Sequence, residues 1–143
     1  QYTKRSDYWN TPSNIYNKLM KEGWVDYNPE GSYYEPFSSE VERFKDKRVF
    51  INPPFSLLDK EEMQETIEGL IRNGNEILFL MPSRTDTRYF HRFLEFEPAI
   101  YFFKGRLSFN DKGSAPFPTM LLLFNSDVKS IYKALDRELN IIK

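Results

Sequence analysis

The sequence contains no cysteine and a single histidine, His91. Without cysteine the chain has no disulfide framework, no thiolate nucleophile and no cysteine-based zinc site. One histidine also argues against a Ser-His-Asp triad and against a metal site built from several histidines. We expect His91 to lie on an exposed helix face rather than to act in catalysis.

Long apolar runs and an excess of positive charge are missing as well. No stretch approaches the ~18 apolar residues of a membrane span, and no signal peptide stands at the start, so we expect a reducing, cytoplasmic setting and no membrane partner. Lys and Arg together number 20 and Asp and Glu 21, a net charge of -1. A self-sufficient DNA-binding protein usually carries more cations than anions. Local positive charge remains, because Arg84, Arg88 and Arg92 recur at helical spacing.

The length of 143 residues predicts one domain, 1–143, too short to hold a catalytic domain and a sizeable recognition domain. Hydrophobic residues make up 40% and charged residues 29% of the chain, which indicates a globular protein. Aromatic residues reach 17%. They either fill a core of Phe and Tyr or form a surface that stacks on bases, and composition alone leaves both open.

The order of apolar runs and helical patterns predicts an α/β fold. The predicted strands are 24–26, 48–51, 77–81, 99–103 and 119–124, with 105–109 continuing the fourth or pairing beside it. The predicted helices are 12–22, 59–72, 87–93 and about 127–139, and the stretch 30–47 reads as loop with one helical turn near 39–44. Thr11 would cap the first helix, with Pro12 at its first position. This alternation predicts a mostly parallel central sheet with helices on both faces.

Three residues stand at the ends of predicted strands: Asp26 ends the first strand, and Asn52 and Pro82 directly follow the next two. Ligands of such sheets sit at the carboxyl ends of the strands. We therefore expect these three residues to share one rim and to take part in a joint site.

The segment Asn52-Pro53-Pro54-Phe55 carries the most chemical information. Two successive prolines hold the chain extended and stiff. The side-chain oxygen of Asn52 and the carbonyl of Pro53 could accept the hydrogens of an exocyclic amine, which would aim its lone pair at a methyl donor, and Phe55 could stack on an extruded base. The simpler interpretation of the same residues is a turn that ends a strand.

Asn-Pro-Pro-Phe after an apolar strand resembles the catalytic motif of amino-methyltransferases. The wider pattern is similar to the phage-type Dam family of DNA N6-adenine methyltransferases, over about residues 8–124. The matching segments, in order, are Tyr8-Trp9-Asn10-Thr11-Pro12, Asp26, Asn52-Pro53-Pro54-Phe55-Ser56, Leu80-Met81-Pro82-Ser83-Arg84-Thr85-Asp86-Thr87, Gly105-Arg106-Leu107-Ser108-Phe109 and Ala115-Pro116-Phe117-Pro118. Each segment alone is weakly or moderately specific, and their order is the stronger signal.

The resemblance implies transfer of a methyl group from S-adenosyl-L-methionine to adenine in DNA, in a bacterial or phage-infected cell. It implies a Rossmann-like methyltransferase sheet whose last strand, 119–124, runs antiparallel. The implied catalytic residues are Asn52, Pro53, Pro54 and Phe55, and the implied cofactor residues are Trp9, Thr11, Pro12, Asp26 and Asn28. Arg84, Asp86 and Arg106 are candidates for contacts with the DNA, although Asp86 could instead cap a helix and both arginines could simply be solvated.

The sequence departs from the family around Asp26. No glycine-rich loop precedes this residue, and only about twenty residues separate it from Arg48, too few for two further strand–helix units. We therefore expect a compact sheet that is reduced on one edge, with Glu35 or Glu40 as candidates for the ribose hydroxyls. Two alternatives stay open: a non-catalytic methyltransferase-like module that binds nucleic acid, a protein partner or a second copy of itself, and a methyltransferase acting on RNA adenine or protein Gln.

Overall fold

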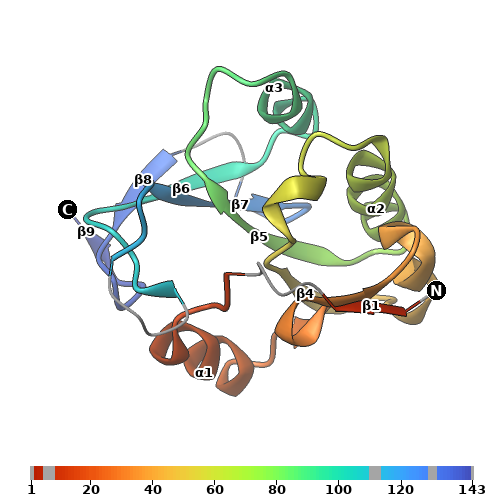
Figure 1. Ribbon diagram of the computed structural model, residues 1–143, viewed down its shortest axis with the longest axis horizontal. Helices are drawn as coiled ribbons and strands as arrows, with labels where there is room; N and C mark the ends of the chain where they lie inside the picture. Colours follow the sequence, from red (N-terminus) through yellow and green to blue (C-terminus); the bar gives the residue numbers. More distant parts are fainter. Residues whose placement is uncertain (1, 5–8, 110–113, 129–131, 143) are drawn as a thin grey trace.

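A computed structural model describes residues 2–4, 9–109, 114–128 and 132–142 of the chain. Over these residues a mixed seven-stranded sheet carries helices on both faces (Figure 1). The α-helices are α1 (Ser13–Lys21), α2 (Glu61–Arg72) and α3 (Arg88–Leu94), and the short 3-10 helices are η1 (Pro29–Gly31), η2 (Phe37–Arg43) and η3 (Phe55–Leu57). The sheet strands are β2 (Val25–Asp26), β4 (Arg48–Ile51), β5 (Glu76–Pro82), β6 (Ala99–Phe103), β7 (Thr119–Phe124), β8 (Tyr132–Leu135) and β9 (Ile141–Ile142). A separate antiparallel ribbon joins β1 (Tyr2–Lys4) to β3 (Ser32–Tyr34).

The strand order of the sheet is β2-β4-β5-β7-β6-β8-β9. β2, β4 and β5 are parallel, β7 runs antiparallel between β5 and β6, β8 is parallel to β6, and β9 is antiparallel to β8. The expected α/β class, with a mostly parallel sheet, is confirmed at this level. The segment 119–124 is antiparallel to its neighbours as expected, but it is not the last strand.

The predicted helix over 127–139 is wrong, because this region contains β8. Tyr132, Leu135 and Leu139 have helical spacing, yet of these three only Leu135 is fully buried and Tyr132 is 78% exposed. β8 pairs with the free edge of β6 over four positions, from Ile100↔Tyr132 to Phe103↔Leu135. Pairing with an otherwise open strand edge outweighs the weak helical pattern.

The predicted strand at 105–109 is not formed either. The backbone N–H of Lys104 donates to Leu135 O at 2.7 Å, which closes the ladder with β8. Gly105 then takes φ +83°, a value that glycine adopts without strain, and the chain turns away from the sheet.

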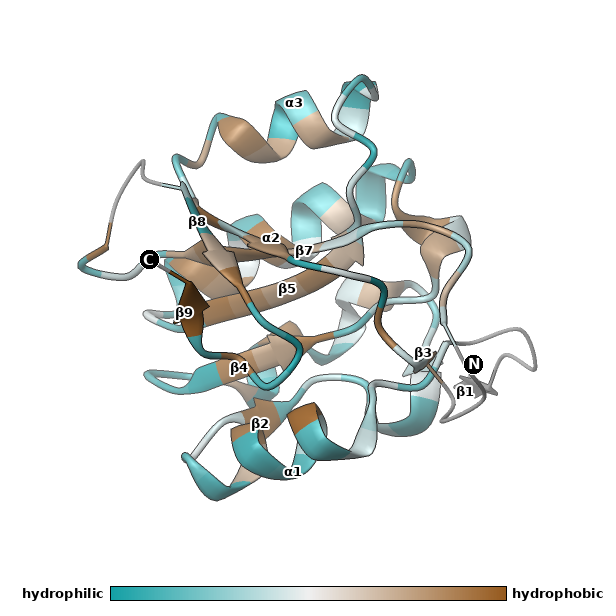
Figure 2. Cartoon of the chain, turned by 90° about the vertical axis from the view of Figure 1, so that its left-hand side faces the viewer, coloured by the Kyte–Doolittle hydropathy of each residue, from teal (hydrophilic) through white to brown (hydrophobic). Residues whose placement is uncertain are grey.

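Alternate residues of the central strands point into two separate cores. Val49, Ile51, Ile77 and Phe79 pack with α2, α3 and η2 on one face. On the other face, Phe50, Leu78, Leu80 and Leu121 pack with α1 and with the chain around β8. The hydropathy colouring of Figure 2 shows apolar strands between helices whose outer sides are polar. Both faces are covered, which explains why these strands read as continuous apolar runs.

The helix starts differ from the expected ones in two places. α1 begins at Ser13, no side chain caps it, and the Thr11 hydroxyl instead accepts a hydrogen bond from Asn52 Nδ2 at 3.0 Å. At α3 the cap is Thr87, whose Oγ1 accepts from Phe90 N at 3.4 Å, rather than Asp86. The expected exposure of His91 is confirmed.

The carboxyl ends of the parallel strands meet at one edge of the sheet. Asp26 ends β2, Asn52 directly follows β4 and Pro82 ends β5, so the expected shared rim is confirmed. β7 enters at this edge, where Thr119 pairs with Pro82. Beyond the two-residue strand β2, none of the described residues adds a strand to the sheet, in agreement with the expected reduced edge.

Asn75 joins the elements that lead into β4 and β5. Its side chain is fully buried. Its Nδ2 donates to Phe44 O at 2.8 Å and to Leu70 O at 3.0 Å, while its Oδ1 accepts from Lys47 N at 2.9 Å. One side-chain amide thus forms hydrogen bonds with backbone groups of three segments: the residue after η2, α2 and the residue before β4.

Replacing Asn75 should therefore destabilise the fold. Asn75→Ala removes the side-chain partner of Phe44 O and Lys47 N, while Leu70 O keeps its bond from the backbone N–H of residue 75, and we expect the free energy of unfolding to fall by about 3 kcal/mol. Urea denaturation measures this change. Asn140→Ala, which removes an exposed amide bonded to Asp136, is the matched control and should shift the value by less than about 0.5 kcal/mol. Equal losses in the two variants would contradict this role of Asn75.

Candidate functional site

The Asn52 side chain is buried at the end of β4, with 1% of its surface exposed. Its Nδ2 donates to Trp9 O at 2.7 Å and to Thr11 Oγ1 at 3.0 Å. Its Oδ1 is buried and has no hydrogen-bond partner among the described residues. Most buried acceptors are paired, and an unpaired one costs about 1–3 kcal/mol, so this oxygen is a candidate acceptor for a ligand.

A line of hydrogen bonds connects Asn52 to the end of β2. The backbone carbonyl of Asn52 accepts from Asn28 Nδ2 at 2.8 Å, and the backbone N–H of Asn28 donates to Asp26 Oδ1 at 3.1 Å. Asn28 is fully buried, and within the described part of the chain its Oδ1 is unpaired too. Two hydrogen bonds thus connect three residues that the sequence predicted as site residues: Asp26, Asn28 and Asn52.

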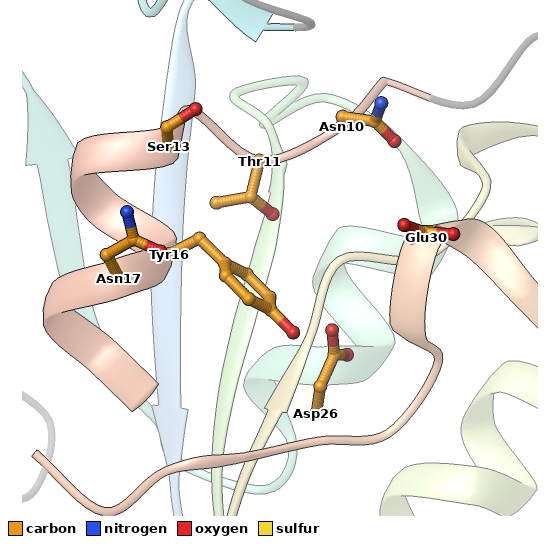
Figure 3. Close-up of a pocket in the computed structure, with 7 residues that line it drawn as sticks. All are labelled: Asn10, Thr11, Ser13, Tyr16, Asn17, Asp26 and Glu30. Atoms are coloured by element: carbon orange, nitrogen blue, oxygen red, sulfur yellow. The ribbon is translucent and has the colours of Figure 1, made fainter. Parts of the chain in front are cut away.

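A cavity of about 320 Å³ opens beside Asp26, and we call it the Asp26 cavity (Figure 3). One side is formed by α1 and the residues before it, and the other by Asp26 and η1. Its lining residues are Asn10, Thr11, Ser13, Tyr16, Asn17, Asp26 and Glu30. The lining is polar, with carboxylates, hydroxyls and amides facing the same space.

The Asp26 carboxyl is paired with Tyr16 across this cavity. Burial raises the pKa of Asp26 to about 6, although hydrogen bonds from the Asn28 N–H and from Tyr16 lower it in part. Burial also raises the pKa of Tyr16 to about 12, and the neighbouring charge of Asp26 acts in the same direction. Tyr16 therefore remains a proton donor to Asp26, and the ionised Asp26 carries a charge that a cationic ligand would stabilise.

Glu30 supplies the second carboxylate of the cavity. Its backbone has φ 54° and ψ 30°, a left-handed conformation that is costly for a residue other than glycine. Figure 3 shows its carboxylate on the far side of the cavity from α1. Glu35 and Glu40, the acids expected near a ribose, do not line this cavity: Glu35 is exposed, and Glu40 lies 3.6 Å from Arg43 beside a different cavity.

Four aromatic rings gather next to Asn52, and we call them the aromatic cluster: Trp9, Phe55, Phe109 and Phe117. Trp9 meets Phe117 at 5.4 Å between ring centroids, and Phe55 meets Phe117 at 5.5 Å, both edge to face. Phe109 lies 5.8 Å from Phe117. Pro53 and Pro54 are buried, and Pro54 O accepts a hydrogen bond from the N–H of Leu57, the last residue of η3.

The predicted cofactor residues divide into three groups. Thr11 and Asp26 line the Asp26 cavity, and Asn28 bonds directly to Asp26. Trp9 belongs to the aromatic cluster, and Pro12 is buried beside a third cavity. Tyr16, Asn17 and Glu30 were missed; Tyr16 follows Pro12 by one helical turn, a spacing that could have indicated it.

The predicted DNA-contacting residues Arg84, Asp86 and Arg106 are all exposed. Arg84 and Asp86 lie between β5 and α3, on the same edge of the sheet as Asn52. Arg106 follows β6, and its Nη1 donates to Ala115 O at 3.4 Å. None of the three lines the Asp26 cavity, so a contact with substrate would be made outside it.

Comparison of the chain with protein-family models, with curated proteins and with solved structures found no match. Within the described ranges, no helix is both long and apolar enough to cross a membrane. The same residues hold no group of three or more His, Asp or Glu placed to bind a metal ion. The functional argument therefore depends on the geometry of this edge of the sheet.

The raised pKa of Asp26 predicts a pH-dependent stability. Its folded pKa of about 6 exceeds the value near 3.9 of an unfolded Asp, so the folded state binds the proton more tightly. The Asp26 contribution to the free energy of unfolding is therefore largest below pH 4 and is lost as the pH rises through 6.

Asp26→Asn should remove this dependence. Between pH 4 and pH 7 we expect the difference in unfolding free energy, variant minus wild type, to increase by about 2 kcal/mol. Denaturant unfolding at several pH values measures it. A difference that stays constant over this pH range would show that burial does not raise the pKa of Asp26.

Proposed function

We propose that this chain is an S-adenosyl-L-methionine-dependent methyltransferase that acts on the N6 amino group of adenine in DNA. The observation that supports it most is the unpaired, buried Oδ1 of Asn52, held in Asn52-Pro53-Pro54-Phe55 at a strand end beside a polar cavity. The order β4-β5-β7-β6, with β7 antiparallel, is also compatible with a Rossmann-like methyltransferase sheet.

The chemistry requires an amine whose lone pair points at a methyl donor. An exocyclic amine is a poor nucleophile, since its lone pair is delocalised into the ring. The Oδ1 of Asn52 and the carbonyl of Pro53 would accept its two hydrogens and favour a pyramidal nitrogen. Asn52 is suited to this because its Nδ2 is already fixed by Trp9 O and Thr11 Oγ1, so the oxygen is oriented before substrate arrives.

No strong base is needed for this reaction. The nitrogen would bond to the methyl group as the methyl–sulfur bond breaks and the sulfonium sulfur leaves as a neutral thioether. The nitrogen, then cationic, would lose its proton to water. Because the Oδ1 of Asn52 is covered, the base reaches it only when neighbouring side chains move. An extruded base would then find Phe55 and the other rings of the aromatic cluster as stacking partners.

The Asp26 cavity fits the cofactor in chemistry. Its volume of about 320 Å³ is at the lower end of the range for small-molecule sites, about 300–1,000 Å³. Asp26 would accept hydrogen bonds from the ammonium group, and Glu30 would accept them from ribose hydroxyls. When bound, S-adenosyl-L-methionine supplies an electrophilic methyl group on a sulfonium.

A second candidate is a methyltransferase-like module that binds nucleic acid or a protein without catalysis. The two-residue strand β2 favours it, because this edge offers little framework for the adenosine half of the cofactor. A protein partner or a second copy of the chain could complete that edge. RNA adenine and protein Gln present the same kind of amine, and they are distinguished by product analysis.

Asn52→Ala tests the proposed catalytic role. In single-turnover transfer of a labelled methyl group to mixed-sequence DNA, we expect the rate to fall by about 100-fold or more, because the acceptor that orients the amine is gone. Calorimetry should show weaker cofactor binding, because Thr11 in the cavity lining also loses its bond to Asn52 Nδ2, so transfer is compared at saturating cofactor, and circular dichroism should show an intact fold. Arg72→Ala, which removes an exposed side chain of α2, is the control. Full activity in Asn52→Ala would exclude this assignment.

The raised pKa of Asp26 predicts that the affinity for the cofactor depends on pH. An ammonium group beside Asp26 stabilises its ionised form, so binding at pH 6, where the carboxyl is about half protonated, should release about half a proton per site, and affinity should rise between pH 5 and pH 7. Calorimetry in two buffers of different ionisation enthalpy measures the released proton. Asp26→Asn should bind about tenfold more weakly and lose most of this release. Unchanged affinity and linkage in that variant would place the ammonium elsewhere.

A further inference from the structure

A third cavity, of about 290 Å³, lies at the start of α1, and we call it the Arg137 cavity. Three segments that are far apart in sequence form it: the start of α1, the chain after β6 and the turn between β8 and β9. Its lining residues are Pro12, Asn14, Ile15, Leu107, Ser108, Arg137 and Glu138. The turn between β8 and β9, in the region where the sequence predicted a helix, supplies Arg137 and Glu138.

The turn that carries Arg137 is well ordered by hydrogen bonds. Asp136 Oδ1 accepts from Glu138 N and from Asn140 N, both at 2.9 Å. The turn is also attached to α1, since Asn14 Nδ2 donates to Arg137 O at 3.2 Å and Lys18 Nζ to Glu138 O at 3.0 Å. Its backbone position is therefore fixed from two sides.

The Arg137 side chain lies across Gly105. A Cβ added to Gly105 would be 3.6 Å from Arg137 Nε. Arg137 is exposed and forms no ion pair within the described part of the chain. Arg106, by contrast, donates to Ala115 O and so helps to hold its own loop. Of these two arginines, Arg137 is the one whose guanidinium is available.

Two charged residues line the Arg137 cavity, Arg137 and Glu138. Lys18 adjoins it, since its Nζ donates to Glu138 O, and Asp136 belongs to the same turn. Asp136 is already engaged by the backbone of its own turn. A guanidinium with a nearby hydroxyl and amide suits a phosphate, which accepts paired hydrogen bonds.

Two residues that line the Arg137 cavity, Pro12 and Ser108, are next in sequence to residues of the Asn52 site. Pro12 follows Thr11, whose hydroxyl accepts from Asn52 Nδ2. Ser108 precedes Phe109, a member of the aromatic cluster. We propose that the Arg137 cavity binds a backbone phosphate of the nucleic acid whose base reaches Asn52, with Arg137 as its principal cation. The identity of that base rests on the proposed function.

This phosphate contact is measured by fluorescence anisotropy of a labelled mixed-sequence duplex between about 50 and 200 mM salt, the range over which phosphate contacts weaken. Arg137→Ala should weaken binding about tenfold for every sequence and reduce the salt slope by about 1. Arg137→Lys should recover part of the affinity. Arg72→Ala, which removes an exposed arginine on α2, is the matched control and should leave both quantities unchanged.

Several outcomes would overturn the inference. The first is that the wild type does not bind DNA, and the second is that Arg137→Ala and Arg72→Ala lose the same DNA affinity. The third is that Arg137→Ala loses as much affinity for an acidic peptide of matched charge as it loses for DNA. Methyl transfer and cofactor calorimetry, run in parallel, separate this inference from the proposed function. If the wild type transfers methyl groups and Arg137→Ala binds DNA as the wild type does, only the phosphate site is overturned. If DNA binding requires Arg137 but no methyl group is transferred, only the proposed enzyme is overturned.

Discussion

The hydrogen bonds from Asn52 Nδ2 to Trp9 O and Thr11 Oγ1 are the interaction on which the site depends. They fix the segment before α1 onto the end of β4, and so bring α1 over the strand ends. The Asp26 cavity, the aromatic cluster and the Arg137 cavity all include residues of this segment or its neighbours. The same bonds orient Asn52 so that its oxygen, rather than its nitrogen, is left for a ligand.

Sequence patterns predicted the central strands and the shared rim because local apolar runs and their polar ends carry that information. They could not predict β8, since its pairing with β6 depends on an edge that exists only in the folded sheet. Arg137 was missed for this reason. Glu30 was missed because its left-handed backbone decides where its carboxylate lies, and neither Glu35 nor Glu40 reaches the same cavity. Thr11 was expected as a helix cap and is instead a partner of Asn52.

Charge is separated along this edge of the sheet. Asp26 and Glu30 place two carboxylates where a cationic cofactor group would bind, whereas the exposed guanidinium of Arg137 lines a different cavity together with Glu138. A net charge of -1 therefore does not describe either surface. With the carboxylates of Asp26 and Glu30 in one cavity and the Arg137 guanidinium in another, a cationic and a polyanionic ligand would have separate sites.

The central claim is amine methylation directed by Asn52, and the most direct measurement is identification of the product. The protein is incubated with labelled S-adenosyl-L-methionine and DNA, RNA or protein in turn, and each digest is analysed by mass spectrometry. The account predicts N6-methyladenine in the DNA digest. Label confined to RNA or protein would contradict the proposed substrate, and absence of label from all three, with cofactor bound, would contradict the proposed activity.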